Sequence, residues 1–175
     1  MVIMMITEEM AAALNAQVAH EFGAMVQYLG IANYFQRLTL PELSKHFYDQ
    51  ASEEREHAEK FIAHIHDTGA ALRIPAILEQ KFEFSSVEEA VKASLQQEIE
   101  VTNQINALVK LSREKDDYVT ENFLAFFVAE QLEEVSSMQD LLAVVQRAGQ
   151  ERLLLVEEFV IRHRNHQNLF GKSGK

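Results

Sequence analysis

The chain has 175 residues, a formal net charge of −11 and no cysteine. A chain of this length can bury a sizeable core, and its acidic balance argues against nucleic acid and anionic membrane surfaces as partners. The lack of cysteine excludes disulfides, thiolate-bound metal centres and a cysteine nucleophile. With only 6 glycines and 2 prolines, few turns are expected, and we predict a single all-α domain over residues 1–175.

The first residues, MVIMMITEE, carry no basic side chain, and two glutamates follow the short apolar run at once. This pattern does not match a signal peptide. Elsewhere in the sequence, no apolar run approaches the length needed to span a membrane. We therefore expect a cytoplasmic protein.

Helical periodicity predicts two long helices in the first part of the chain, at about residues 7–36 and 40–68. Thr7 precedes two glutamates and is expected to cap the first helix. The second helix opens with TLPE, in which Thr39 and Glu42 match a capping-box pattern. The short connection between the two helices predicts an antiparallel pair.

The same periodicity predicts three more helices, at about residues 86–113, 118–148 and 151–164, of which the last is short. A short connection joins the first two of these three, so they should also form an antiparallel pair. The last stretch, NHQNLFGKSGK at residues 165–175, lacks a continued apolar pattern. We expect it to be a mobile tail.

The connection at residues 69–85 is long and irregular, and loops of that length are uncommon in compact domains unless they have a purpose. A helix of ~28 residues is ~42 Å long, and ~17 extended residues can span that distance. This segment can therefore return the chain along the whole bundle. We predict a four-helix bundle with one long crossover between the second and third helices and a short fifth helix.

Each of the four long helices carries glutamate within its inward-facing series, near the middle of the helix. These residues are Glu21, Glu54, Glu98, and Glu130 with Glu134. Because the midpoints of helices of similar length share one layer of a bundle, the carboxylates should converge. Burial of several carboxylates without partners is very costly, so bound metal is the simplest explanation.

The spacing of the polar residues supports a metal site. Glu54 and His57 form E-x-x-H, and Gln131 and Glu134 have the same spacing, which puts each pair on one helix face. Four carboxylates and one imidazole can hold two divalent cations, and a ligand set this rich in oxygen favours iron or manganese over zinc or copper. The predicted ligands are Glu21, Glu54, His57, Glu98 and Glu134.

A structural explanation stays open beside the metal site. Any one of these glutamates alone would be read as a rim residue, and His57 alone as a hydrogen-bonded core residue. A polar layer can also serve only to fix register and assembly. Tyr28, further along the face that carries Glu21, is expected either to pack in the core or to lie beside the metals.

Four stretches resemble the bacterial non-haem ferritins. They are LNAQVAHEFGAMVQY (14–28), HFYDQASEEREHA (46–58), QQEIEVTNQIN (96–106) and NFLAFFVAEQLEEV (122–135). They occur in the order typical of that family, and the similarity extends over almost the whole chain. The resemblance implies a four-helix bundle with a long crossover and a short fifth helix, assembled into a hollow shell of twenty-four subunits.

The resemblance also implies how the central residues would bind iron. A first iron would be held by Glu21, Glu54 and His57. Glu54 would bridge to a second iron, which Glu98 and Glu134 would also hold. Together these residues would form a ferroxidase centre inside one subunit.

Further residues would lie around that centre, as the resemblance implies. Gln131 would lie near the second iron, and Tyr28 would lie beside the two-iron centre. Bacterial ferritins can bind a third iron on the side of the cavity. That position would use Glu53, Glu130 and Glu133, with Glu134 shared.

Two departures from the related bacterioferritins argue against haem. Those proteins have a second E-x-x-H on the fourth helix, where this chain has Gln131 and Glu134. Their haem-ligating methionine would align with Arg55. Both departures favour a centre through which iron passes, rather than a permanent di-iron cofactor.

The expected function is iron storage and detoxification, in which Fe(II) is oxidised by O₂ or H₂O₂ and deposited as a ferric oxyhydroxide mineral. The competing enzyme hypothesis is a di-iron oxygenase or a rubrerythrin-like peroxidase. Lack of cysteine removes electron delivery of the rubredoxin type. The competing non-enzyme hypothesis is a bundle whose polar layer is purely structural.

Overall fold

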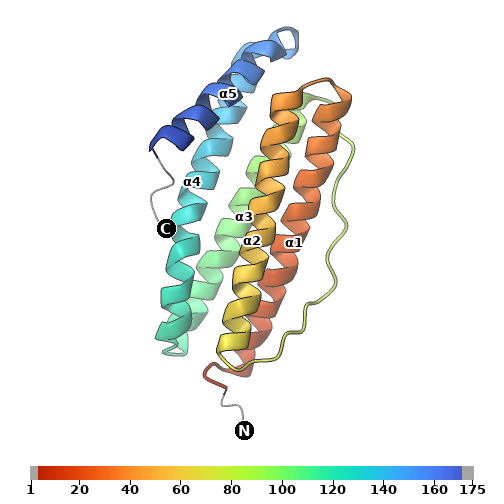
Figure 1. Cartoon of the computed structure of the whole chain (residues 1–175). Helices are drawn as coiled ribbons and strands as arrows, with labels where there is room; N and C mark the ends of the chain where they lie inside the picture. Colours follow the sequence, from red (N-terminus) through yellow and green to blue (C-terminus); the bar gives the residue numbers. More distant parts are fainter. Residues whose placement is uncertain (1–3, 171–175) are drawn as a thin grey trace.

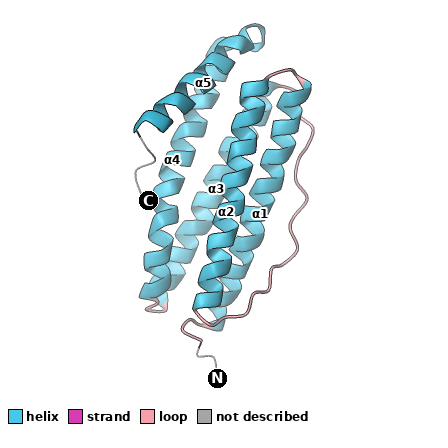
Figure 2. Cartoon of the chain, viewed as in Figure 1, coloured by secondary structure: helices cyan, strands magenta, loops and turns pink. Residues whose placement is uncertain are grey.

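The computed structural model describes residues 4–170, with side chains described as far as His163. Within that range the chain forms helices and no strand (Figure 2). The elements are α1 (Glu8–Arg37), α2 (Pro41–Asp67), α3 (Val87–Glu114), α4 (Tyr118–Ala148), a 3₁₀ turn η1 (Gln150–Arg152) and α5 (Leu153–Phe170). The predicted all-α bundle with a long crossover and a fifth helix is confirmed.

The four long helices lie side by side, and the crossover passes along the outside of α1 from one end of the bundle to the other (Figure 1). α1 packs mainly against α2, and α3 mainly against α4. Because the crossover returns the chain to the far end, α2 and α3 run in the same direction. α5 folds back from the end of α4 and contacts α4 and α2.

The first four helices begin and end within one residue of the bounds predicted from periodicity. The fifth helix differs, because it continues to Phe170. Residues 165–170, predicted as part of the tail, are helical, so the predicted helix end at residue 164 is six residues too early. Residues 171–175 lie outside the described residues.

Two amide side chains of α1 hold the extended crossover. Asn15 Nδ2 donates to the carbonyl of Ala71 (3.0 Å), and its Oδ1 accepts from the N–H of Arg73 (2.5 Å). Gln27 Nε2 donates to the carbonyl of Lys81 (2.6 Å), and its Oε1 accepts from the N–H of the same residue (2.9 Å). The amides thus satisfy peptide groups that would otherwise find no partner in the fold.

A glycine allows the crossover to lie close to α1. A Cβ atom at Gly30 would lie 2.5 Å from Cδ1 of the Phe82 ring, too close for a real contact. Glycine in a helix interior costs about 1 kcal/mol relative to alanine. Here it makes room for an aromatic ring of the crossover.

The capping predictions had different outcomes at the two helix starts. Thr7 caps α1 as predicted, accepting from the N–H of Met10 (3.1 Å). The capping box predicted at Thr39 is wrong: the N-cap is Leu40, and Thr39 has a positive φ of 59°. The cap of α2 comes instead from the buried carboxylate of Glu157 in α5.

Glu157 binds both of the first free peptide groups of α2. Its Oε2 accepts from the N–H of Glu42 (3.0 Å), and its Oε1 accepts from the N–H of Leu43 (2.8 Å). A carboxylate at a helix N-terminus is favourable both as a hydrogen-bond acceptor and as a charge. α5 is therefore attached to the bundle by a charged cap as well as by apolar packing.

The apolar core is divided into two clusters. One includes Tyr28, Ala51, Val91 and Met138 and is completed by the start of α2 and by α5. The other lies towards the opposite end of the bundle and includes Val18, Ala58, Val101 and Phe127. On every long helix the predicted acidic position falls between the two clusters.

None of the helices within residues 4–170 combines the length and the apolar character needed to cross a membrane.

Candidate metal centre

Each long helix contributes at least one buried polar side chain to the layer between the two clusters. Glu21 and Glu98 are 0% exposed, Glu54 is 3% exposed, and His57 and Gln131 are 4% exposed. Each of these polar residues shares a helix face with the buried apolar residues on either side of it. Helical spacing therefore points the polar side chains inward as well. Burial therefore agrees with the predicted convergence for Glu21, Glu54 and Glu98. On α4 the buried residue is Gln131, and the predicted Glu130 and Glu134 are half-buried.

Three of these side chains form a compact group. Glu21, Glu54 and His57 each offer a ligand atom within 4.8 Å of the others, and among the described side chains no other set of three acids or histidines is this compact. Glu54 Oε2 lies 3.4 Å from His57 Nδ1. The Oε2 atoms of Glu21 and Glu54 are buried and accept no hydrogen bond. Two carboxylate oxygens and one imidazole are thus available to a cation.

Burial raises the pKa of all three central carboxyl groups. For Glu21 the negative charge of Glu54 adds to the effect of burial, and for Glu54 the charge of Glu98 does so. The pKa of Glu98 rises from 4.5 to about 7, again chiefly through burial. Low dielectric and like charges disfavour the ionised form, and a divalent cation would offset both.

Glu98 lies in a second group that is already hydrogen-bonded. The Tyr28 hydroxyl donates to Glu98 Oε1, and Gln131 Nε2 lies 3.4 Å from Glu98 Oε2, to which it donates. The pKa of Tyr28 is raised well above its usual value by burial and by the charge of Glu98. Tyr28 therefore remains a neutral donor, and its side chain both packs in the core and lies in the acidic layer.

Glu134 is half-buried and lies near this second group. Its negative charge helps to raise the pKa of both Glu54 and Tyr28. The structure therefore places Glu134 close enough to act on the layer electrostatically. It lies outside the compact group of three.

The residues predicted for a third metal position are less enclosed. Glu53 and Glu130 are half-buried, and Glu133 is exposed. Glu130 Oε2 lies 4.0 Å from His57 Nε2, and Glu53 Oε2 accepts from Gln50 Nε2 (2.9 Å). Glu130 thus faces the opposite ring nitrogen of His57 from the one near Glu54, whereas Glu133 is the furthest towards solvent.

Aromatic rings form one wall of the layer. The His57 ring packs edge-on against Phe127, with centroids 5.4 Å apart, and against Phe126, with centroids 6.1 Å apart. Lys60 Nζ lies over the Phe126 ring at 5.1 Å from its centroid. These rings exclude water from one side of His57 and lower the local dielectric around the acids.

Two polar residues that the sequence reasoning missed support the acids. Gln17 Nε2 donates to Glu21 Oε1 (2.7 Å), which leaves Glu21 Oε2 to face the layer. The Thr102 hydroxyl lies 2.9 Å from Gln131 Oε1. Gln17 precedes Glu21 by four residues and Thr102 follows Glu98 by four, so helical spacing contains the signal that would have found them.

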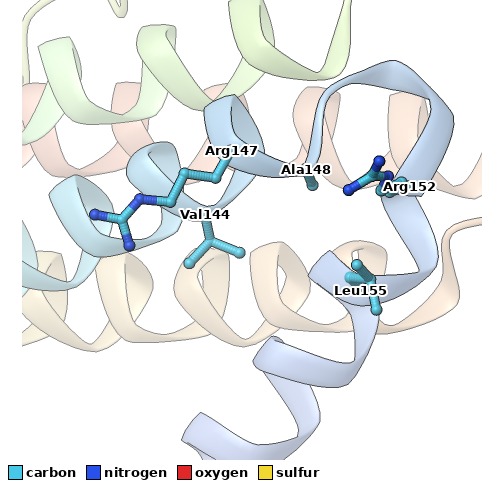
Figure 3. A pocket seen from close by; sticks show the side chains of 5 residues that line it. All are labelled: Val144, Arg147, Ala148, Arg152 and Leu155. Carbon is cyan, nitrogen blue, oxygen red and sulfur yellow. The ribbon is translucent and has the colours of Figure 1, made fainter.

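A surface hollow lies elsewhere, where α4 ends and α5 begins (Figure 3). Its lining includes two arginines, Arg147 and Arg152, and three apolar side chains, Val144, Ala148 and Leu155. None of the predicted site residues lines it. The acidic layer is therefore distinct from this basic and apolar hollow.

Comparison with known proteins gives a consistent result. The family model described as a ferritin-like domain matches residues 11–148. A ferritin BfrB of Mycobacterium tuberculosis is 40% identical over 151 residues, covering 86% of this chain and 83% of that protein. A bacterial non-heme ferritin of Staphylococcus aureus is 35% identical over 147 residues, covering 84% of this chain and 89% of that protein.

Similarity also extends to solved structures. An open pore ferritin from the hyperthermophilic archaeon Archaeoglobus fulgidus superposes with a TM-score of 0.86 at 31% identity. The match covers 90% of this chain and 98% of that chain. The resemblance first noted in four short stretches thus extends to the fold as a whole.

Proposed function

Because the chain belongs to the ferritin family, we propose that it stores and detoxifies iron by oxidising Fe²⁺ at the acidic layer. The observation that carries this proposal is the compact group of Glu21, Glu54 and His57, with two buried carboxylate oxygens that accept no hydrogen bond. Carboxylate oxygens with one imidazole suit iron. Iron here is the substrate.

The proposed roles are those that the resemblance to ferritins implies, and the compact group of Glu21, Glu54 and His57 supports them. Glu21, Glu54 and His57 bind the first Fe²⁺. Glu54 also bridges to a second Fe²⁺, which Glu98 and Glu134 hold. The negative charge of Glu134 helps to raise the pKa of Glu54, so the two carboxylates lie close enough to interact, which supports this assignment.

Three further glutamates are proposed to receive iron at a third position as it leaves. Glu130 lies on the Nε2 side of His57, and Glu53 precedes Glu54 on α2. Their partial exposure, and the greater exposure of Glu133, suit a position between the buried layer and solvent.

Oxidation requires an electron acceptor, which we propose to be O₂ or H₂O₂. Each of two Fe²⁺ ions gives one electron; O₂ takes both with two protons to form H₂O₂, whereas H₂O₂ takes both with two protons to form two waters. The protein contributes geometry and negative charge, which favours Fe³⁺ over Fe²⁺. Tyr28, Gln17 and Gln131 keep the carboxylates in place by donating hydrogen bonds.

Storage requires an enclosed space, and we propose a homo-oligomeric shell of twenty-four subunits in the cytoplasm, filled with ferric oxyhydroxide. Exposed apolar side chains on the crossover support contacts between subunits. They are Leu72, Ile74, Ile77, Leu78 and Phe82. A run of this kind is unusual on the surface of a monomer and is typical of an interface.

The test is an iron-loading experiment with a matched pair of variants. Fe²⁺ is added anaerobically, air is admitted, near-ultraviolet absorbance is followed, and the particle is sized. Glu54→Ala should abolish fast oxidation and leave the shell assembled. Glu56→Ala, an exposed glutamate on the same helix, should behave like the native protein.

The other outcomes separate the competing functions. Fast oxidation by Glu54→Ala would refute the assignment of the centre. Fast oxidation by a small oligomer that forms no mineral would favour an oxygenase or a peroxidase. A native protein that does not accelerate oxidation over buffer would leave a structural role for the layer.

A further inference from the structure

The amide of Gln131 lies between two polar groups of α3, one on each end. Its Oε1 lies 2.9 Å from the Thr102 hydroxyl, and its Nε2 lies 3.4 Å from Glu98 Oε2. Gln131 is 4% exposed and Thr102 is half-buried. The amide is therefore oriented by contacts within the protein.

The Thr102 hydroxyl favours one orientation of the amide. When its single proton points at Gln131, the hydroxyl attracts the amide oxygen, which leaves the amide nitrogen to face the Glu98 carboxylate. If the amide were rotated, its oxygen would face a carboxylate oxygen, and two acceptors would repel each other. The hydroxyl and the carboxylate thus favour the same orientation.

The orientation matters because an amide oxygen is a neutral ligand for iron, and an amide N–H is not. With Thr102 holding the oxygen, Gln131 turns its N–H groups towards Glu98, the residue assigned to the second iron. A cation bound there would gain no ligand from Gln131. It would meet the positive end of the amide dipole instead.

We propose that Thr102 is a positioning residue that withholds the Gln131 oxygen from the second iron position and so keeps iron there loosely bound. This inference rests on the proposed function, because it assumes that Glu98 holds the second ion. Its consequence is kinetic. Oxidised iron leaves the second position readily because the position lacks one ligand that a neighbouring side chain could supply.

A simpler reading gives Thr102 no role at the centre. Its hydroxyl also lies 2.7 Å from the carbonyl of Glu98, four residues earlier in α3. Because a hydroxyl has one proton, this bond competes with the bond to Gln131. Threonine often makes such a bond within a helix. On that reading, loss of the hydroxyl would change the stability of α3 and leave metal binding unchanged.

The test measures binding of Co²⁺, which does not undergo the ferroxidase reaction, by calorimetric titration of the full protein. Thr102→Val preserves shape and removes the hydroxyl, and Thr102→Ser restores it. In Thr102→Val, the weaker class of Co²⁺ sites should tighten by about tenfold, because the freed amide oxygen adds a ligand. The size is comparable to the roughly 10–100-fold loss, opposite in direction, that follows when a hydrogen-bond partner of a metal ligand is removed. The tighter class should be unchanged, and Thr102→Ser should match the native protein.

A double variant separates the amide from other effects. If the amide oxygen causes the gain, the Thr102→Val substitution should have no effect on Co²⁺ affinity in a Gln131→Ala background. An equal gain in both backgrounds, or none in Thr102→Val alone, would overturn the role of Thr102. Circular dichroism would verify that each variant keeps its helices.

The failure of this inference can be distinguished from the failure of the proposed function. Two classes of Co²⁺ sites in the native protein that are both insensitive to Thr102→Val would refute only the role of Thr102. A native protein without a second class of sites would refute the assignment of Glu98 to a second ion, and the inference with it.

Discussion

Chelating all metal from the protein should make its stability fall as the pH rises from about 4.5 to 7. The cause is the buried carboxyl of Glu98, whose pKa is about 7 in the fold and 4.5 when unperturbed. The folded state therefore holds a proton that the unfolded state releases. Stability from this group is fully present below pH 4.5 and is lost as the pH rises through 7.

The size of the effect follows from the width of that window. Each pH unit between the two pKa values changes the free energy of unfolding by about 1.4 kcal/mol, so Glu98 alone should remove about 3 kcal/mol. Burial also raises the pKa of Glu21 and Glu54, and their effects have the same sign. Metal that replaces these protons should abolish the pH dependence.

Guanidinium unfolding at pH 5, 6 and 7, with chelator and at one protein concentration, measures the slope. Glu98→Gln should be less pH-dependent than the native protein, because it removes both its own titration and one of the charges that act on Glu54. Glu100→Gln, an exposed neighbour on α3, serves as the control and should keep the native slope. A metal-free native protein whose stability is constant or rises from pH 5 to 7 would refute this reasoning, as would an unchanged slope in Glu98→Gln.

Three further substitutions test other contacts. Glu157→Ala should destabilise the protein by about 2 kcal/mol, because two peptide N–H groups at the start of α2 lose a charged acceptor. Denaturant midpoints measure this loss. Glu158→Ala, at an exposed position, is the control and should cost far less. Gly30→Ala should displace the Phe82 ring, and this cost opposes the gain of about 1 kcal/mol that alanine brings inside a helix; Gly30→Ala should therefore raise thermal stability more in a Phe82→Ala background than alone, and equal effects in the two backgrounds would contradict the close contact. Glu130→Ala should slow repeated iron turnover more than the first round of oxidation, as measured by successive Fe²⁺ additions, and equal slowing of both would argue against a third position.

The helices and the acidic layer could be predicted from the sequence because both depend on local spacing. A glutamate within a series of apolar residues keeps the inward direction of that series, as Glu21 and Glu98 do. The layer then follows from helices of similar length. Glu133 shows the limit of this reasoning: it adjoins the layer in sequence, yet it is exposed.

The start of α2 could not be predicted in the same way. Thr39 and Glu42 match a local capping pattern, but the carboxylate that caps the helix belongs to Glu157, 115 residues beyond Glu42. A long-range contact with a charged acceptor replaced the local one. Gln17 and Thr102 are different from Glu157, because each lies one helical turn from an acid of the layer. Their contacts could therefore have been predicted from local spacing in the sequence.

The division of the apolar core by the acidic layer has a consequence for how such a chain can change over generations. Residues in one cluster, such as Met138, have their neighbours on one side of the layer, and residues in the other, such as Phe127, have theirs on the opposite side. Changes at distant, unconnected positions have nearly additive effects on stability. Each end of the bundle can therefore accumulate substitutions independently of the other end, and the acidic layer between them is left unchanged.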